Sequence, residues 1–322
     1  MNALGGFVGV GMTGKYGWII VVILTAGSAV TEAQTKFRSS VDLVALSVVA
    51  TDGQGRLVSG LTADDFRVLE DGVPQPISFF ATTPMPIDLA ILLDTSASMS
   101  DKISTVQAAA VGFTAAMRPG DRVTVVDIKD KIRVVHPLSE DVAGARAAIQ
   151  STIPKGNTAL YNGLYMTLKE LMKQRGPAGE IRRQAIVVLS DGDDTISLVS
   201  YDDVNELAKQ SGVAIYTITL RSALARNTFA RQTAVNSEAE FAMKELSMIT
   251  GARAFFPAAI TELAGVYGVI AEELAGQYSL GYSPANPHRE NVFRRIDVRI
   301  ERPGIRARTR TGYVGRTAVA SR

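Results

Sequence analysis

The stretch Ile87–Met99, with the sequence IDLAILLDTSASM, constrains the fold of this chain more than any other. It opens with an almost unbroken apolar run, which is typical of a strand buried on both faces of a parallel sheet. The run ends in Asp94, Ser96 and Ser98, and a helix is expected directly after them. Alternate residues of an extended segment point the same way, so these side chains can present oxygen atoms to one point. That point is the carboxyl end of the strand, where open α/β sheets bind ligands.

The oxygen atoms of this triplet suit a hard divalent cation. Mg²⁺ prefers few carboxylates, neutral oxygens and retained waters in an octahedral arrangement. Ser and Asp are also favoured at helix N-caps. The triplet alone therefore leaves a metal site and a purely structural role equally open.

Composition narrows the class of protein. The 322 residues are 46% hydrophobic, which suffices for one large or two modest domains with a sizeable core. The 34 basic and 32 acidic residues give a net charge of +2, so no global field attracts nucleic acid, and we expect no nucleic-acid partner. Cysteine is absent, which excludes disulfides, thiol nucleophiles and cysteine-ligated metals.

Residues 1–33 resemble a secretory signal peptide. Lys15 precedes an apolar run at residues 18–24, and small residues follow through Ala29 and Ala33. We expect cleavage after Ala33, with Ala29 as the alternative. The sequence therefore predicts an exported protein, either periplasmic or secreted.

Two features of this segment stay open. Met12 lies close to Lys15 and makes a more ordinary start of a signal peptide than Met1 does. The apolar run is too short to span a bilayer comfortably. Membrane attachment is expected only if the segment stays uncleaved.

Residues 86–276 alternate strands with helices, which indicates βαβ units and a doubly wound, mostly parallel sheet. An antiparallel hairpin is expected at one edge of this sheet, and residues 223–238 are predicted to form a loop. The other strands are expected at 87–94, 185–189, 213–220 and 252–256, the hairpin strands at 122–128 and 132–137, and the helices at 106–117, 141–149, 160–174, 202–210, 239–249 and 260–275.

The segments on both sides of this region have the sequence pattern of short strands joined by turns. Neither flank has enough strands for a two-layer core, and together they supply about six. We therefore predict that residues 34–85 and 277–315 are the two halves of one small β-sandwich, into which the α/β domain of residues 86–276 is inserted. Residues 316–322 are expected to be a tail. The predicted strands lie at 43–51, 66–70, 77–80, 278–283, 293–301 and 305–311.

Two further oxygen-bearing positions belong near Asp94 in a doubly wound sheet. Thr158 lies on a loop before a helix, and Asp191 follows a core strand. With these positions the chain resembles the von Willebrand factor A (VWA) domain family, over residues 86–276. Residues 94–98 match the family motif Asp-x-Ser-x-Ser, Thr158 its distant threonine and Asp191 its final aspartate.

The resemblance implies a Rossmann-like fold with a metal-ion-dependent adhesion site (MIDAS). In such a site Ser96, Ser98 and, in the ligand-ready state, Thr158 contact Mg²⁺ directly, while Asp94 and Asp191 act largely through bound waters. Mn²⁺ or Ca²⁺ are alternatives to Mg²⁺. In family members that bind proteins, an Asp or Glu carboxylate of the partner fills an open coordination position. Because few protein carboxylates touch the ion, it keeps a net positive charge that attracts this group.

The flanks carry a second resemblance. Residues 48–61 and 65–72 are similar to the leading segment of exported bacterial A-domain-related proteins, and residues 278–282 and 302–304 to their trailing segment. That group has no common ligand. The likeness therefore supports the architecture more than a function.

Other acidic and basic residues are interpreted as structural. We interpret Asp193 and Asp194 as part of a solvated acidic loop rather than as a second cation site. Asp202 and Asp203 fit a helix N-terminus, where carboxylates offset the helix dipole. The alternating arginines of residues 306–310 favour a charged strand surface that resists aggregation over a polyanion site.

The sequence predicts an exported, metal-dependent protein-binding module without catalysis. One alternative is a metal-dependent hydrolase in the same cleft, but the sequence offers no obvious general base. Neither His136 nor His288 has a nearby Ser-Asp constellation. The other alternative is a structural or assembly protein that makes its contacts through the sandwich.

Overall fold

The structure, a computed structural model, describes residues 43–83, 85–174, 182–190, 194–220, 231–286 and 291–315. All of them belong to one compact unit, Val41–Arg322. The expected signal peptide and tail lie outside the described residues, as do Asp191, Asp193 and His288. Among the residues that are described, no helix is long and apolar enough to cross a membrane.

The central sheet has six strands in the order β10-β9-β8-β5-β6-β7. Neighbouring strands are parallel except β6 and β7, which form the predicted edge hairpin. This is a doubly wound order, and its winding reverses between β5 and β8. The strands are β5 (Ile87–Asp94), β6 (Arg122–Ile128), β7 (Arg133–Ser139), β8 (Arg183–Ser190), β9 (Ala214–Thr219) and β10 (Ala254–Phe255).

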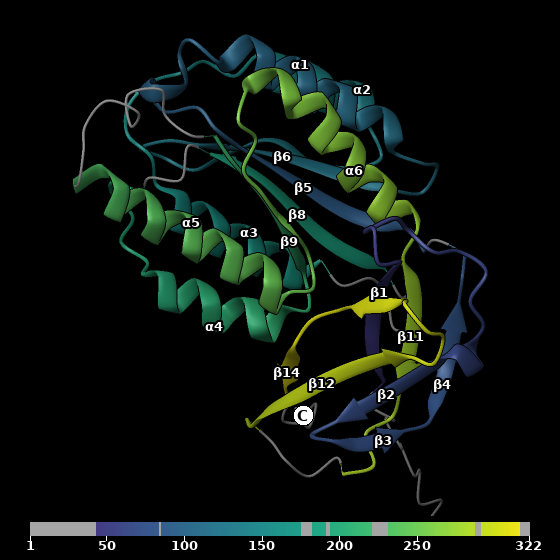
Figure 1. The fold of residues 1–322 in the computed structure, drawn as a ribbon. Helices are drawn as coiled ribbons and strands as arrows, with labels where there is room; N and C mark the ends of the chain where they lie inside the picture. Colours follow the sequence, from purple (N-terminus) through teal and green to yellow (C-terminus); the bar gives the residue numbers. More distant parts are fainter. Residues whose placement is uncertain are drawn as a thin grey trace, which may run out of the picture. The chain divides into compact units, whose positions relative to one another are not determined.

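Helices cover both faces of this sheet (Figure 1). Alternate residues of β5 therefore enter two different cores: Leu89 and Ile91 pack with α1, α2 and α6, whereas Ala90 and Leu92 pack with α3, α4 and α5. This explains why every residue of β5 is buried. The helices are α1 (Ile103–Phe113), α2 (Val142–Gln150), α3 (Leu160–Lys173), α4 (Tyr201–Ser211), α5 (Arg231–Ile249) and α6 (Leu263–Ala275), with short 3-10 turns at Ala63–Asp65, Ala97–Met99, Thr114–Ala116 and Ile260–Glu262.

The predicted loop at residues 223–238 is wrong for its second half. Helix α5 begins at Arg231, eight residues before the expected start at Ala239, while residues 223–230 lie outside the described residues. Residues 231–238 are polar and lack a clear apolar period, but they contain no glycine or proline. Once the apolar face of residues 239–249 has nucleated the helix, extending it backwards costs little.

The flanks form two four-stranded sheets, β13-β1-β11-β4 and β14-β12-β2-β3. Each sheet contains strands from both flanks, so the predicted class, an α/β domain inserted in a β-sandwich, is confirmed. Its core includes Val48, Phe66 and Leu280. The strands are β1 (Val44–Thr51), β2 (Phe66–Glu70), β3 (Val73–Gln75), β4 (Ile77–Ala81), β11 (Tyr278–Tyr282), β12 (Phe293–Ile300), β13 (Arg306–Arg308) and β14 (Gly312–Val314).

The described flanks hold eight strands rather than the six expected. The additional strands, β3 and β14, have three residues each. Pro74 and Gly312 lie within them, and both residue types have low strand propensity. Only pairing with β2 and β12 makes these segments extended.

The end of β13 and the residues after it connect the sandwich to the α/β domain. The guanidinium of Arg308 donates to the carbonyl of Gly251 at 2.7 Å and pairs with the buried Glu273. Gly251 has a φ of +78°, and a Cβ at this position would lie 2.4 Å from the backbone of Arg310. Glycine is therefore required here for the two parts to approach each other.

Candidate metal centre

Asp94 lies at the carboxyl end of β5, where the winding of the sheet reverses, and is fully buried. Its Oδ1 accepts a hydrogen bond from the Ser96 amide at 2.9 Å. Its Oδ2 accepts one from the hydroxyl of Ser190, at the end of β8, at 2.6 Å. The carboxylate thus bridges the two strands on either side of the switch point, where doubly wound proteins bind their ligands.

The hydroxyls of Ser96 and Ser98, in the turn that follows Asp94, lie 2.9 Å from each other. Neighbouring ligands in a Mg²⁺ octahedron with bonds of ~2.1 Å are about 3.0 Å apart. Both oxygens can therefore turn to one ion without movement of the backbone. Because protein groups already donate to both oxygens of Asp94, this carboxylate suits contact with the ion through water.

The loop that contains Thr158 is fixed against the loop after β5. The Ala97 amide donates to the carbonyl of Gly156 at 2.9 Å, and the Lys155 amide donates to the carbonyl of Thr95 at 2.8 Å. The structure thus brings together the two segments that the sequence analysis predicted to meet. Thr158 itself is buried, with an exposed fraction of 4%, although the sequence favoured an open loop.

Asp130 holds this loop in place through hydrogen bonds to its side chain. Its Oδ1 accepts hydrogen bonds from the backbone and side-chain amides of Asn157 at 2.9 and 3.0 Å, and these bonds lower the pKa of Asp130. Gly156 has a φ of +77°, and a Cβ there would lie 1.8 Å from Asp130 Oδ2. Glycine at position 156 tolerates both the positive φ and the close approach of Asp130. The sequence analysis predicted no role for either residue.

Asp127 is a second supporting residue that the sequence did not assign to the site. It is buried near the end of β6, accepts a hydrogen bond from the Thr95 hydroxyl and pairs with Lys129 at 2.8 Å. It thereby holds the loop after β5 from the side opposite β8. A carboxylate within the mostly apolar run of residues 123–128 was the only signal of this role.

Asp191 follows Ser190 directly and lies outside the described residues, so its predicted role stays a prediction. Asp194 accepts a hydrogen bond from the Ser197 hydroxyl at 2.7 Å, consistent with the structural role expected for it. Asp203 forms a capping box with Ser200 at the start of α4, as predicted for a helix N-terminus.

The described residues contain no cluster of three His, Cys, Asp or Glu side chains that could hold a metal. Serine and threonine hydroxyls are therefore the principal candidate ligands in this part of the chain. His136 is buried and lies within hydrogen-bond distance of Ser139, 3.0 Å away, on the edge strand β7. That strand is separated from β5 by β6.

Comparison with known proteins identifies the class of the α/β domain. Residues 89–193 match the family model of the von Willebrand factor type A domain. A search of curated proteins found no match.

Several solved structures resemble the chain. The VWF domain of the type V pili tip protein Mfa5 from Porphyromonas gingivalis has 16% identity and a TM-score of 0.47, with 60% of this chain and 95% of that chain covered. A von Willebrand factor type A protein from Catenulispora acidiphila has 13% identity, a TM-score of 0.47 and coverages of 88% and 76%. Proximal thread matrix protein 1 from the mussel byssus, with a zinc-occupied MIDAS motif, has 17% identity, a TM-score of 0.47 and coverages of 64% and 49%. The chain thus spans about half the length of the mussel protein.

Proposed function

We propose that this chain is an exported protein-binding module whose VWA domain holds a divalent cation at the carboxyl end of its central sheet. Ser96, Ser98 and Thr158 would contact the ion, which we take to be Mg²⁺ with Mn²⁺ or Ca²⁺ as alternatives. Asp94 and Asp191 would act through waters. The bound ion would supply positive charge and an open coordination position for an Asp or Glu of a partner protein.

The arrangement around Asp94 gives the main support for this proposal. Two hydroxyls 2.9 Å apart follow a buried carboxylate that accepts hydrogen bonds from neutral donors on both sides of the switch point. A helix cap alone does not account for this arrangement, because Ser96, the N-cap residue of the following 3-10 turn, makes no side-chain cap hydrogen bond. The position of His136, hydrogen-bonded on the edge strand, favours binding over general-base catalysis.

Titration of the full-length chain with MgCl₂ by calorimetry tests the cation site. Ser98 and Ser100 are both exposed serines of the same turn, and only Ser98 belongs to the proposed site. Ser98→Ala should weaken Mg²⁺ binding by roughly 10-fold or more, because it removes a ligand, whereas Ser100→Ala should bind like the wild type. Equal affinities of the two variants would refute ligation by Ser98.

A pull-down from the exported and envelope proteins of the source organism tests the binding role. The protein should capture a partner in Mg²⁺ but not in EDTA, and Asp94→Ala should capture none. Capture that is equal under all these conditions would move the contact surface to the sandwich. Absence of any partner would direct the search to hydrolysis of phosphate or ester substrates.

A further inference from the structure

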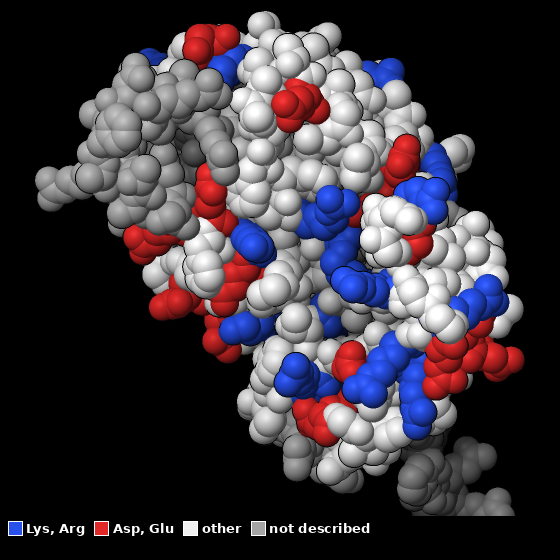
Figure 2. Space-filling model, in the orientation of Figure 1, with Lys and Arg blue, Asp and Glu red and all other residues white. Residues whose placement is uncertain are grey.

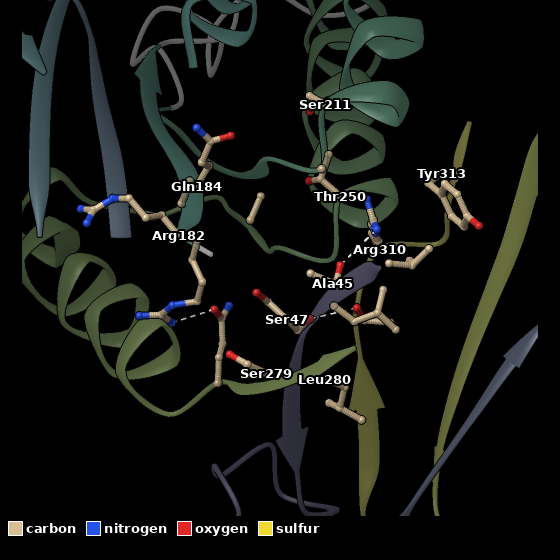
Figure 3. Close-up of a pocket in the computed structure, with 18 of the residues that line it drawn as sticks. Ala45, Ser47, Arg182, Gln184, Ser211, Thr250, Ser279, Leu280, Arg310 and Tyr313 are labelled. Carbon is tan, nitrogen blue, oxygen red and sulfur yellow. Dashed lines mark hydrogen bonds between the residues drawn. The ribbon is translucent and has the colours of Figure 1, made fainter. Parts of the chain in front are cut away.

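A cavity of about 430 Å³ lies at the other end of the central sheet, between the α/β domain and the sandwich. Figure 3 shows its lining: Ser47 and Ser279 come from sandwich strands, and Gln184 and Thr250 from the α/β domain. Its size is in the range of small-molecule sites, which often lie between domains.

Small residues on the outer face of one sandwich sheet make room for this cavity. Ala45 pairs with Gly281 and Ser47 pairs with Ser279 across β1 and β11. Paired residues share a face of the sheet, and the alternate residues Leu46 and Leu280 point into the sandwich core. A leucine or valine at the small positions would project into this space and reduce it.

The polar groups of the lining favour an anion. Four arginines and one carboxylate line the cavity, and that carboxylate, Asp88, is shared by the guanidiniums of Arg122 and Arg182. In the space-filling view, basic side chains gather where the α/β domain meets the sandwich (Figure 2). A recess lined by charge of one sign concentrates ions of the opposite sign.

Arg183, at the amino end of β8, forms no ion pair with any of the described residues. Within that part of the chain its guanidinium donates only to neutral acceptors, which are the carbonyls of Met85 and Leu274 and the side-chain oxygen of Gln277. Burial lowers the pKa of this guanidinium, and the field of Asp121 opposes that effect without an ion pair. A partly buried cation of this kind is stabilised by an anion in the cavity.

Ser279 provides an independent indication of a ligand. Its side chain is 95% buried, lines the cavity and has no hydrogen-bond partner for its hydroxyl among the described residues. A buried hydroxyl without a partner is costly, because it has lost its hydrogen bonds to water. A ligand oxygen in the cavity would accept this bond.

We propose that this cavity binds a small organic carboxylate, with its charged group near Arg183 and Ser279 and its apolar body against Phe79 and Leu43. A single carboxylate matches the charge of Arg183, whose guanidinium donates to neutral acceptors. This site is separate from the cation site, because Arg183 and Ser190 lie at opposite ends of β8.

Calorimetry and ligand-observed NMR on the full-length chain in EDTA test this proposal. The probes are hexanoate and benzoate, their uncharged counterparts hexanamide and benzamide, and inorganic phosphate. The carboxylates should bind at least tenfold more tightly than the amides. Equal binding of acids and amides, binding of phosphate alone, or no binding of any probe would overturn the proposal.

Variants locate the site. Arg183→Gln should lower the affinity for hexanoate at least tenfold, and Ser279→Leu should do the same because it removes the hydroxyl and projects an apolar side chain into the cavity. Arg299→Gln, at an arginine exposed on β12 and paired with Asp297, is the control and should bind like the wild type. If Arg183→Gln does not fold, Ser279→Ala replaces it: a several-fold loss of affinity supports the proposal, and wild-type affinity in this variant overturns it.

Discussion

Strand β5 carries a fully buried aspartate at each end, and the two are held in different ways. Asp88, near the amino end, forms ion pairs of 2.7 Å with Arg122 and 2.8 Å with Arg182. Asp94, at the carboxyl end, accepts hydrogen bonds from an amide and a hydroxyl. An aspartate paired with arginines anchors a fold, whereas one held by neutral donors beside further hydroxyls suits a site for an external cation.

This comparison predicts that Asp88→Asn has the largest effect on stability. The substitution leaves two guanidiniums without their shared carboxylate, and breaking a buried pair in this way costs about 3–5 kcal/mol of unfolding free energy. Urea denaturation measures the loss. Asp297→Asn, at an exposed ion pair, is the control and should cost less than about 1 kcal/mol. Similar losses in the two variants would contradict an anchoring role for Asp88.

Asp94→Asn should reduce stability less than Asp88→Asn does, and Mg²⁺ affinity more. We expect it to cost only about 1–3 kcal/mol, because it weakens hydrogen bonds rather than an ion pair. It should, however, reduce Mg²⁺ affinity by roughly 10- to 100-fold, as loss of a group that orients metal ligands does. Calorimetric titration measures this change, and Asp88→Asn under conditions where it stays folded should bind Mg²⁺ normally. If Asp88→Asn lost Mg²⁺ while Asp94→Asn kept it, the proposed division of roles would be wrong.

Gly156→Ala tests whether the loop before Thr158 must keep its backbone conformation. The variant combines a left-handed φ with a collision against Asp130, so we expect a loss of about 1–3 kcal/mol and weaker Mg²⁺ binding. Gly120 has a φ of +85° and open space around its Cβ position, so Gly120→Ala is a matched control that has only the backbone strain. Thermal melts and Mg²⁺ titrations compare the two. Normal Mg²⁺ binding by Gly156→Ala would show that the loop adapts.

Lowering the pH should destabilise the protein by protonating Asp88. Burial alone would raise the pKa of Asp88, but hydrogen bonds and charges from Arg122 and Arg182 outweigh it and hold this pKa below its ordinary value. A lowered carboxyl pKa gives stability that is complete above the unfolded pKa and is lost as pH falls through the folded pKa. Below about pH 4 the wild type should therefore lose stability more steeply than Asp88→Asn, as urea denaturation at several pH values would show. Parallel pH profiles would contradict this assignment.

The pattern of apolar and polar residues predicted an element correctly wherever its period matched the faces that the element buries. The apolar run of β5 and the alternating residues of β12 specified their strands, because their periods match the faces they bury. The start of α5 and the short strands β3 and β14 could not be predicted. Their conformations depend on partners distant in the sequence, or on helix propagation, rather than on their own residues.

The residues of the candidate site also divide into those that the sequence predicted and those that it did not. The spacing of Asp94, Ser96 and Ser98 pointed to a metal site, since alternate residues after a strand converge. The supporting residues Asp127 and Asp130 left almost no signal. Their carboxylates act on loops that are 32 and 27 residues away in the sequence, and only the folded sheet brings these together.

The sequence by itself determined the alternation of strands and helices, the split sandwich and the oxygen-rich end of β5, because each depends on periodicity or on residues a few positions apart. The tertiary structure alone decided which groups hold Asp94, why Gly156 must be glycine, and that a cavity with an arginine and a buried hydroxyl lies between the two parts. These features arise from contacts between distant segments. Hydrogen-bond geometry and empty space exist only once those segments have packed.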